Sequence, residues 1–430
     1  MPQSAPQYAQ GIETDTIAAF VRVLLAFAAF FLSWRMFRFS AGNITASDFA
    51  FLVCAFILIV RGQLNPLPYG NMTVPWFLGL FMMLAGLLIG TLAHGDPVRW
   101  AIMASQYLFA FALVPMVLMS SDRNWMRKCT VYYVAGVAVS QVIGVIALNY
   151  LTFADVGGLN SSVITANGRV GAMSGEPNPN GAICAFALPF LVSAVQRRDM
   201  SWKLALPCAV AIIWGLLATA SFTGFASAAI GVAIVVGMSG MGSLARYGIP
   251  IVLLAVAYIA LGGPLPEAFD KRVGQALVTG DPGKAGTYTG RSAVAAEAWN
   301  LAEGNMLIGL GSDEYRNASA FGIPVHVLHL IVLNEGGLIG FLGLESILAV
   351  MVVIAFSIYR ENRVDGATCL AVVAVFLIFT LSIPHMYTRA WIVPVFLAFA
   401  CAMARERVVW VRRVGVGPSV RHPKVTEQVP

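Results

Sequence analysis

The sequence predicts an all-α polytopic membrane protein with about twelve transmembrane helices and one large outer loop before the tenth. Of its 430 residues, 58% are apolar and only 11% are charged, whereas soluble domains carry about 25% charged residues. Mean hydropathy is +0.78. Apolar runs close to the roughly 20 residues that cross a bilayer recur along the whole chain. They lack the alternating ten-residue pattern of an outer-membrane barrel.

The apolar runs define the predicted spans in order. The second is short, and Ser221 separates the seventh from the eighth. The predicted spans are 16–34, 47–61, 75–93, 99–119, 130–150, 178–196, 203–219, 221–239, 246–262, 337–358, 366–384 and 388–404.

Four regions follow from these spans. Residues 1–262 hold transmembrane helices one to nine, 263–336 form the loop, 337–404 hold helices ten to twelve, and 405–430 form a basic tail. Within the loop, Pro and Gly mark turns, but 292–303 has the pattern of an amphipathic helix. The start of the chain has neither a basic region nor a cleavage site, so we expect no removable signal peptide.

Basic residues predict the orientation of the chain. With both termini inside, the inner segments and tail carry sixteen Arg and Lys residues, and the short outer segments carry five. The positive-inside rule therefore places the large loop on the outer face and the tail along the anionic cytoplasmic leaflet. Arg35 and Arg38 are local exceptions. Because topology accounts for the net charge of +6, we expect membrane lipids as partners and no nucleic acid.

Two histidines in the loop are candidates for chemistry. His326 and His329 lie one helical turn apart within 325–336, which reads as a helix. A histidine at a membrane boundary can act as a general base near neutral pH. The alternative is a buried histidine whose hydrogen bonds are satisfied. No third ligand stands at a zinc-site spacing, and the six cysteines include no CxxC pair, so no metal site is predicted.

Three arginines in the outer segments are candidates for binding phosphate. Arg169, Arg291 and Arg316 carry guanidinium groups, which grip phosphate oxygens in a fixed bidentate geometry. The alternative is an interfacial anchor or an ion pair with a nearby acid such as Glu176. No nucleotide-binding fingerprint is present, so no cofactor is expected. Gly86 and the glycine four residues later indicate a helix-packing contact.

Three segments resemble the O-antigen ligase and polymerase superfamily. GRSAVAAEAWNLAEGNMLIGLGSDEY, from Gly290, is similar to its Gly-Arg segment, and SGEPNPNGAICAFALPF, from Ser174, to its Asn-Pro-Asn segment. HVLHLIVLNEGGLIG, with His326, Gly337 and Gly340, is similar to its histidine motif. The motifs cover about 170–345, and the remainder is similar in topology only.

The resemblance implies a glycosyltransferase of the bacterial inner membrane with its active site on the periplasmic side. Such an enzyme moves a glycan from an undecaprenyl-diphosphate carrier to an acceptor hydroxyl without a nucleotide sugar or a metal. Carried over to this chain, Arg169 and Arg291 would hold the diphosphate and His326 would activate the acceptor. A repeat-unit polymerase for an exopolysaccharide or O-antigen is the function expected, with a flippase and a chain-length regulator as protein partners.

Other functions stay open. Within the superfamily they are an O-antigen ligase and a protein O-oligosaccharyltransferase; outside it, a transporter or lipid-carrier flippase, whose polar site is expected near the bilayer midplane. Two departures weigh against the ligase. Val327 replaces the usual polar residue after the histidine, and SFTGFAS, from Ser221, lacks an arginine that many members carry. The expected supporting residues are Arg316, His329, Glu176 and Asn180.

Overall fold

A computed structural model of the chain describes residues 7–39, 44–152, 155–156, 163–263, 265–274, 278–280 and 288–404. The tail predicted at 405–430 lies outside these residues. Two two-residue strands, β1 (Arg38–Phe39) and β2 (Ile44–Thr45), pair antiparallel; the other described elements are helical. The α-helices are α1 Gln7–Phe31, α2 Ala46–Val60, α3 Thr73–His94, α4 Pro97–Leu108, α5 Val114–Met119, α6 Arg123–Tyr150, α8 Pro177–Gln196, α9 Trp202–Thr219, α10 Phe222–Met238, α11 Met241–Ser243, α12 Ile249–Ala260, α13 Glu267–Phe269, α15 Tyr288–Asn305, α16 Tyr315–Ala318, α17 Leu328–Glu361, α18 Arg363–Thr380 and α19 Arg389–Met403.

The all-α membrane architecture predicted from composition is confirmed. Among the described residues, seven helices are long and apolar enough to cross a membrane, and four shorter ones are apolar over 10–17 residues. Each of the twelve predicted spans overlaps a helix, and Ser221 caps α10 by accepting a hydrogen bond from the Gly224 N–H group. The count of twelve crossings stays a prediction, as does the side of the membrane that each end faces.

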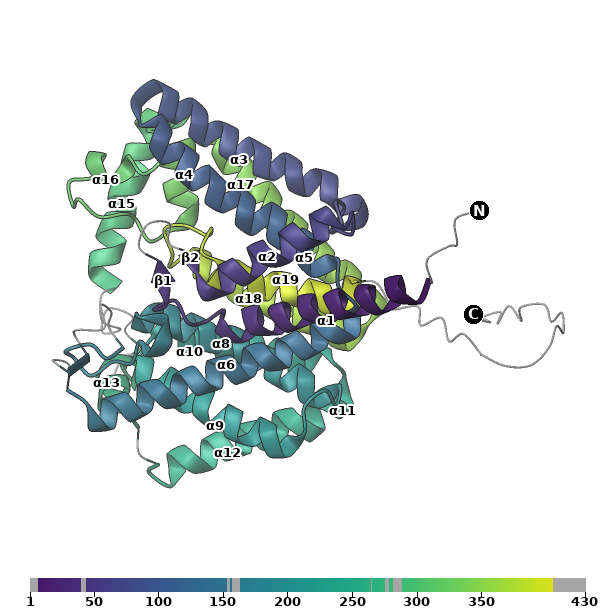
Figure 1. Cartoon of the computed structure of the whole chain (residues 1–430). Helices are drawn as coiled ribbons and strands as arrows, with labels where there is room; N and C mark the ends of the chain where they lie inside the picture. Colours follow the sequence, from purple (N-terminus) through teal and green to yellow (C-terminus); the bar gives the residue numbers. More distant parts are fainter. Residues whose placement is uncertain are drawn as a thin grey trace, which may run out of the picture.

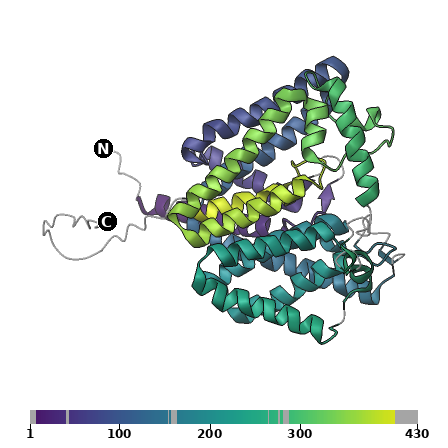
Figure 2. The ribbon, with the colours of Figure 1, turned by 180° about the vertical axis from the view of Figure 1, so that it is seen from behind.

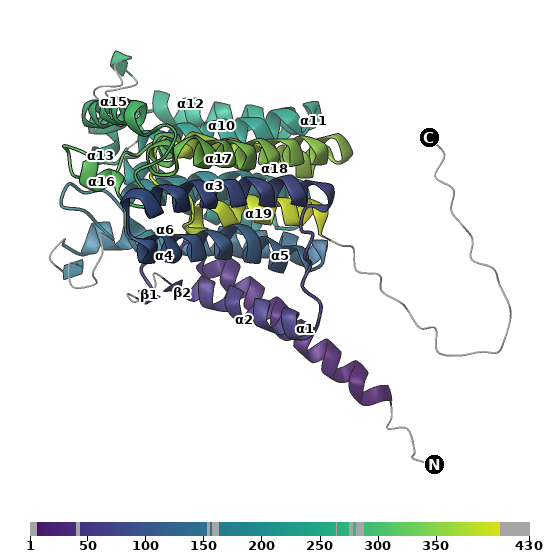
Figure 3. The same cartoon turned by 90° about the horizontal axis from the view of Figure 1, so that it is seen from above.

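The helices form one bundle. Figure 1 shows α3, α4 and α17 on one side and α6, α8, α9 and α10 on the other. Seen from behind, the yellow-green helix α18 and the yellow helix α19 run between these two groups (Figure 2), and nearly all residues of α19 are buried. Seen from above, α13, α15 and α16 gather at one end of the bundle (Figure 3).

Glycines set the close contact between α3 and α17. A Cβ atom at Gly86 would lie 2.3 Å from the Gly340 nitrogen, and one at Gly90 would lie 2.6 Å from the Glu335 carbonyl oxygen. The predicted helix-packing role of these two glycines is thereby confirmed, because only glycine lets the two backbones approach this closely.

Helix α17 is broken at Gly337, where the backbone adopts φ 59° and ψ −165°. A Cβ atom there would lie 2.7 Å from the Leu307 carbonyl oxygen. The break turns Leu328–Gly336 back toward the remainder of α17, because the His329 and Glu345 side chains approach to 2.5 Å. A straight helix would separate these residues by about 24 Å along its axis, at about 1.5 Å per residue.

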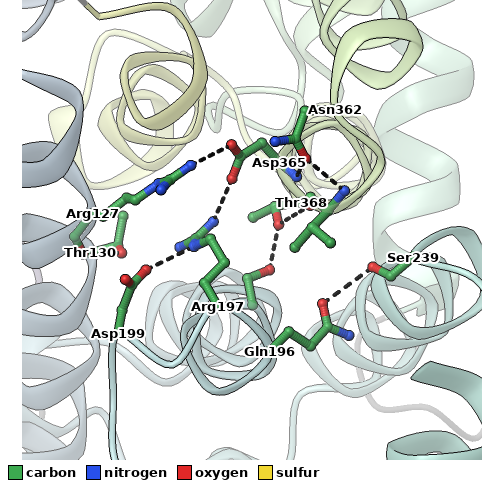
Figure 4. Close-up of polar contacts among 11 residues, drawn as sticks. Arg127, Thr130, Gln196, Arg197, Asp199, Ser239, Asn362, Asp365 and Thr368 are labelled. Carbon is green, nitrogen blue, oxygen red and sulfur yellow. Dashed lines mark hydrogen bonds and ion pairs between the residues drawn. The ribbon is translucent and has the colours of Figure 1, made fainter. Parts of the chain in front are cut away.

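A buried polar network closes one end of the bundle (Figure 4). Asp365, in the first turn of α18, accepts from the Arg127 Nη2 atom at 2.8 Å and from the Arg197 Nη1 atom at 3.0 Å. Arg197 also donates to Asp199 at 2.8 Å. Helix α8 begins at Pro177 and reaches this network about 30 Å further along, at about 1.5 Å per residue. The network therefore joins α6, α8 and α18 far from the start of α8.

Candidate functional site: a cationic cleft at one end of the bundle

A cleft of about 370 Å³ opens at the other end, where α8 and α10 begin and α18 ends. Its volume falls in the range of about 300–1,000 Å³ typical of small-molecule sites. The residues that line the cleft come from the ends of helices and from the segments that connect them. The lining residues are Arg35, Glu176, Asn178, Pro179, Ala220, Ser221, Phe222, Thr223, Arg272, Arg291, His326, Phe379, Ser382, Ile383, Pro384, His385, Tyr387, Thr388 and Trp391.

Positive charge dominates the cleft. Arg35, Arg272 and Arg291 line it, and Glu176 is the one acid among the described lining residues. The Arg35 Nη1 atom and the Arg272 Nε atom are buried and have no hydrogen-bond partner among the described residues. Buried polar groups are ordinarily hydrogen-bonded, so these donors point to an anionic ligand that would complete their bonds.

Each of these arginines lies at the end of a helix or in the segment between two helices. Arg291 lies in the first turn of α15, and Arg35 follows the end of α1. Arg272 lies in the turn Asp270–Gly274. Just before this turn, Phe269 packs edge-on against Phe225 of α10, with ring centroids 5.5 Å apart. The aromatic contact therefore holds the Arg272 turn against the start of α10.

His326 stands two residues before α17 and just ahead of Leu328–Gly336, so it lies outside the helix, which was predicted to begin at residue 325. Burial lowers its pKa, the positive charge of Arg291 lowers it further, and Glu176 opposes both. The imidazole is therefore mostly neutral at neutral pH, which is the form that accepts a proton.

Gathering the arginines has an electrostatic cost, because Arg35 and Arg291 each lie near other positive charges. Burial lowers the pKa of Arg291, and the charge of Arg272 lowers it further. Burial likewise lowers the pKa of Arg35, with Glu176 acting in the opposite direction. An anion bound among them would relieve this repulsion.

Arg169 is placed behind the wall of the cleft and is not among its lining residues. It is 9% exposed, its Nε atom donates to the Thr219 carbonyl oxygen at 2.8 Å, and its Nη2 atom donates to the Asn178 side chain at 2.7 Å. Burial, then Arg272 and Arg291, lower its pKa to about 10. Its bonds hold the 219–223 segment and Asn178 in position, so its contacts are those of a positioning residue.

The predicted supporting residues divide into two sets. Glu176 lines the cleft, whereas Asn180 is fully buried behind it and exchanges hydrogen bonds with Gln141 at 2.8 and 2.9 Å. His329 lies against Glu345 and against Thr380, 3.0 Å from its hydroxyl. Arg316 is exposed on α16 and is not a lining residue. Asn180 is therefore buried with its side-chain hydrogen bonds made, and His329, which is partly exposed, has a hydrogen-bond partner for each ring nitrogen.

Several lining residues were missed by sequence reasoning. Arg35 was noted in the sequence only as an exception to the positive-inside count. Its place in the wall of the cleft now accounts for a positive charge at this position. Arg272 lies in a segment rich in turn residues, and nothing in the sequence singled it out as a site residue. His385 and Tyr387, stacked with ring centroids 5.4 Å apart, come from the connection between α18 and α19, where burial lowers the pKa of His385 to about 4. Their convergence with Arg291 depends on contacts between distant parts of the chain.

Comparison of the chain with protein-family models and with curated proteins found no match.

Proposed function

We propose that this protein joins undecaprenyl-diphosphate-linked oligosaccharide repeat units into an exported polysaccharide, at the periplasmic face of the inner membrane. The observation that carries the proposal is the cleft itself, with three arginines that form no ion pair among the described residues beside a mostly neutral histidine. A diphosphate fits the first feature and a hydroxyl nucleophile fits the second. The three sequence segments that resemble the O-antigen ligase and polymerase superfamily support the same chemistry.

In the proposed reaction, the acceptor sugar hydroxyl attacks the anomeric carbon of the donor glycan. His326 takes the hydroxyl proton, a new glycosidic bond forms, and the bond from the anomeric carbon to the diphosphate breaks. The electron pair of that bond goes to the leaving diphosphate, whose charge Arg35, Arg272 and Arg291 stabilise. Arginines fixed before the reaction stabilise such charge best where water is scarce, and a positioned base contributes about 10²–10⁴-fold.

The position of the cleft suits a substrate with a lipid tail. It lies where helices begin and end, about 30 Å along α8 from the Asp365 network, at about 1.5 Å per residue. A carrier whose tail stays in the bilayer would present its diphosphate at such a boundary. A transporter that binds its cargo midway through the bundle is the less favoured alternative.

The test is polymer formation in cells that depend on this protein. His326→Ala and Arg272→Ala are expected to leave the protein inserted in the membrane while abolishing polymer, with single repeat units accumulating on the lipid carrier. Membrane fractionation measures insertion, and gel electrophoresis with mass spectrometry of the carrier measures the glycans.

The matched control is Arg316→Ala, which removes an exposed arginine outside the cleft and is expected to leave chain length unchanged. Normal chain lengths in His326→Ala and Arg272→Ala would refute the proposal. Full-length polymer that accumulates on the carrier without transfer to the lipid A core would instead identify a ligase.

A further inference from the structure

Three potential metal ligands meet beside the cleft, from three separate segments. Asp313 lies in the loop before α16, Glu335 in the short first segment of α17, and His385 in the connection between α18 and α19. One ligand atom from each lies within 4.8 Å of the others. Opposite ligands on one ion are separated by twice a bond length of about 2.0–2.6 Å, or roughly 4–5 Å. The spacing therefore admits one cation among them.

Glu335 supplies an independent observation. Its side chain is 1% exposed, and its Oε1 atom is buried with no hydrogen-bond partner among the described residues. The carboxylate also faces the backbone N–H groups of Asp313 and Tyr315. Leaving a carboxylate oxygen unpaired in such a position is costly, and a cation between Glu335, Asp313 and His385 would satisfy it.

Arg99 is the competing counter-ion. It forms an ion pair with Asp313, but 54% of its side chain is exposed. An exposed pair of this kind contributes about 0–1 kcal/mol, so a cation that binds both carboxylates can displace it at small cost.

We propose that Asp313, Glu335 and His385 bind a divalent transition-metal cation of the Mn²⁺ or Zn²⁺ type. One imidazole nitrogen and two carboxylate oxygens form a mixed ligand set that suits these ions. The cation would tie the 382–388 connection, which lines the cleft, to the loop before α16 and to α17. Its role is to fix the cleft wall, and the inference does not depend on glycan transfer.

The test uses the full chain, purified in detergent and stripped of metal with a chelator. Binding of Mn²⁺ is followed by electron paramagnetic resonance, and binding of Zn²⁺ by calorimetry. Thermal unfolding is measured with and without each ion. The wild type is expected to bind one ion and to unfold at a higher temperature when it is present. Glu335→Gln is expected to weaken binding by about tenfold or more, whereas Glu303→Gln, which changes an exposed acid on α15, is expected to leave it unchanged.

Arg99→Gln separates the cation site from a purely structural cluster. If the carboxylates bind an ion, removing their competitor tightens Mn²⁺ binding and enlarges the thermal shift. If Arg99 is their sole counter-ion, the variant loses stability and neither ion restores it, which would overturn the proposal. Absence of saturable binding in both wild type and Arg99→Gln would also overturn it. Asp313→Asn provides a second ligand variant if Glu335→Gln does not fold.

Discussion

Replacing Arg291 with glutamine tests the charge arrangement of the cleft most directly. The change removes one of its three lining cations while keeping a polar side chain of similar length. A hydrogen bond to a charged group contributes about 1.5–3 kcal/mol. If Arg291 holds the diphosphate as proposed, loss of one such bond is expected to lower kcat/KM by about 10- to 150-fold, at about 1.4 kcal/mol for each factor of ten.

The same substitution shifts the pH dependence of the reaction. Burial and then the charge of Arg291 lower the pKa of His326, so removing that charge raises the pKa. His326 accepts a proton only when it is neutral, and activity falls as the pH drops through its pKa. The acidic limb of the pH profile is therefore expected to move to higher pH in Arg291→Gln.

The assay is polymer synthesis by the purified protein in lipid nanodiscs, with lipid-linked repeat units as substrate and kcat/KM measured across pH. Arg316→Gln is the control, because Arg316 is exposed and lies outside the cleft. A change in kcat/KM below about threefold for Arg291→Gln, against the 10-fold minimum from the bond energy, would refute the proposed contact. An acidic limb that moves to lower pH would refute the electrostatic reasoning.

Three further predictions address other parts of the structure. Glu176→Gln removes the charge that raises the pKa of His326, so the acidic limb should move to lower pH, opposite to Arg291→Gln; an unchanged limb would contradict this. Asp365→Asn breaks a buried ion network and is expected to cost about 3–5 kcal/mol in chemical unfolding, with unchanged activity per folded molecule. Gly86→Ala forces α3 away from α17 and is expected to cost at least about 1–3 kcal/mol. Its control, Gly237→Ala, adds a methyl group with no atom within 4 Å and should leave the unfolding transition within about 1 kcal/mol of the wild type.

The helices were predictable because their signals are local. Apolar runs long enough to cross a bilayer locate each span in the sequence itself. The amphipathic pattern at 292–303 likewise predicts α15, in which Val294 and Ala298 are buried. The break at Gly337 was not predicted, because the contact that excludes a larger residue there, with the Leu307 carbonyl oxygen, comes from another part of the chain.

The candidate site was predictable only in part, for the same reason. Arg291, His326 and Glu176 belong to motifs, and the structure brings all three into one cleft. Arg35 and Arg272 have no motif around them; Arg35 stood out only as an exception to the orientation count, and Arg272 did not stand out at all. Arg169 shows the converse case, because its position beside a motif suggested ligand binding while its side chain is committed to Thr219 and Asn178.

The break at Gly337 also bears on how the membrane crossings of this chain are counted. Without it, Leu328–Glu361 would be one straight rod of about 51 Å, at about 1.5 Å per residue, far longer than the hydrocarbon core of about 30 Å. With it, residues 338–361 alone span about 36 Å, enough for one slightly tilted crossing. Residues 328–336 reach only about 14 Å, at about 1.5 Å per residue, which is too short to cross such a core. The break therefore leaves only one part of Leu328–Glu361 long enough to cross a bilayer, and the short part before it adds no length to that crossing.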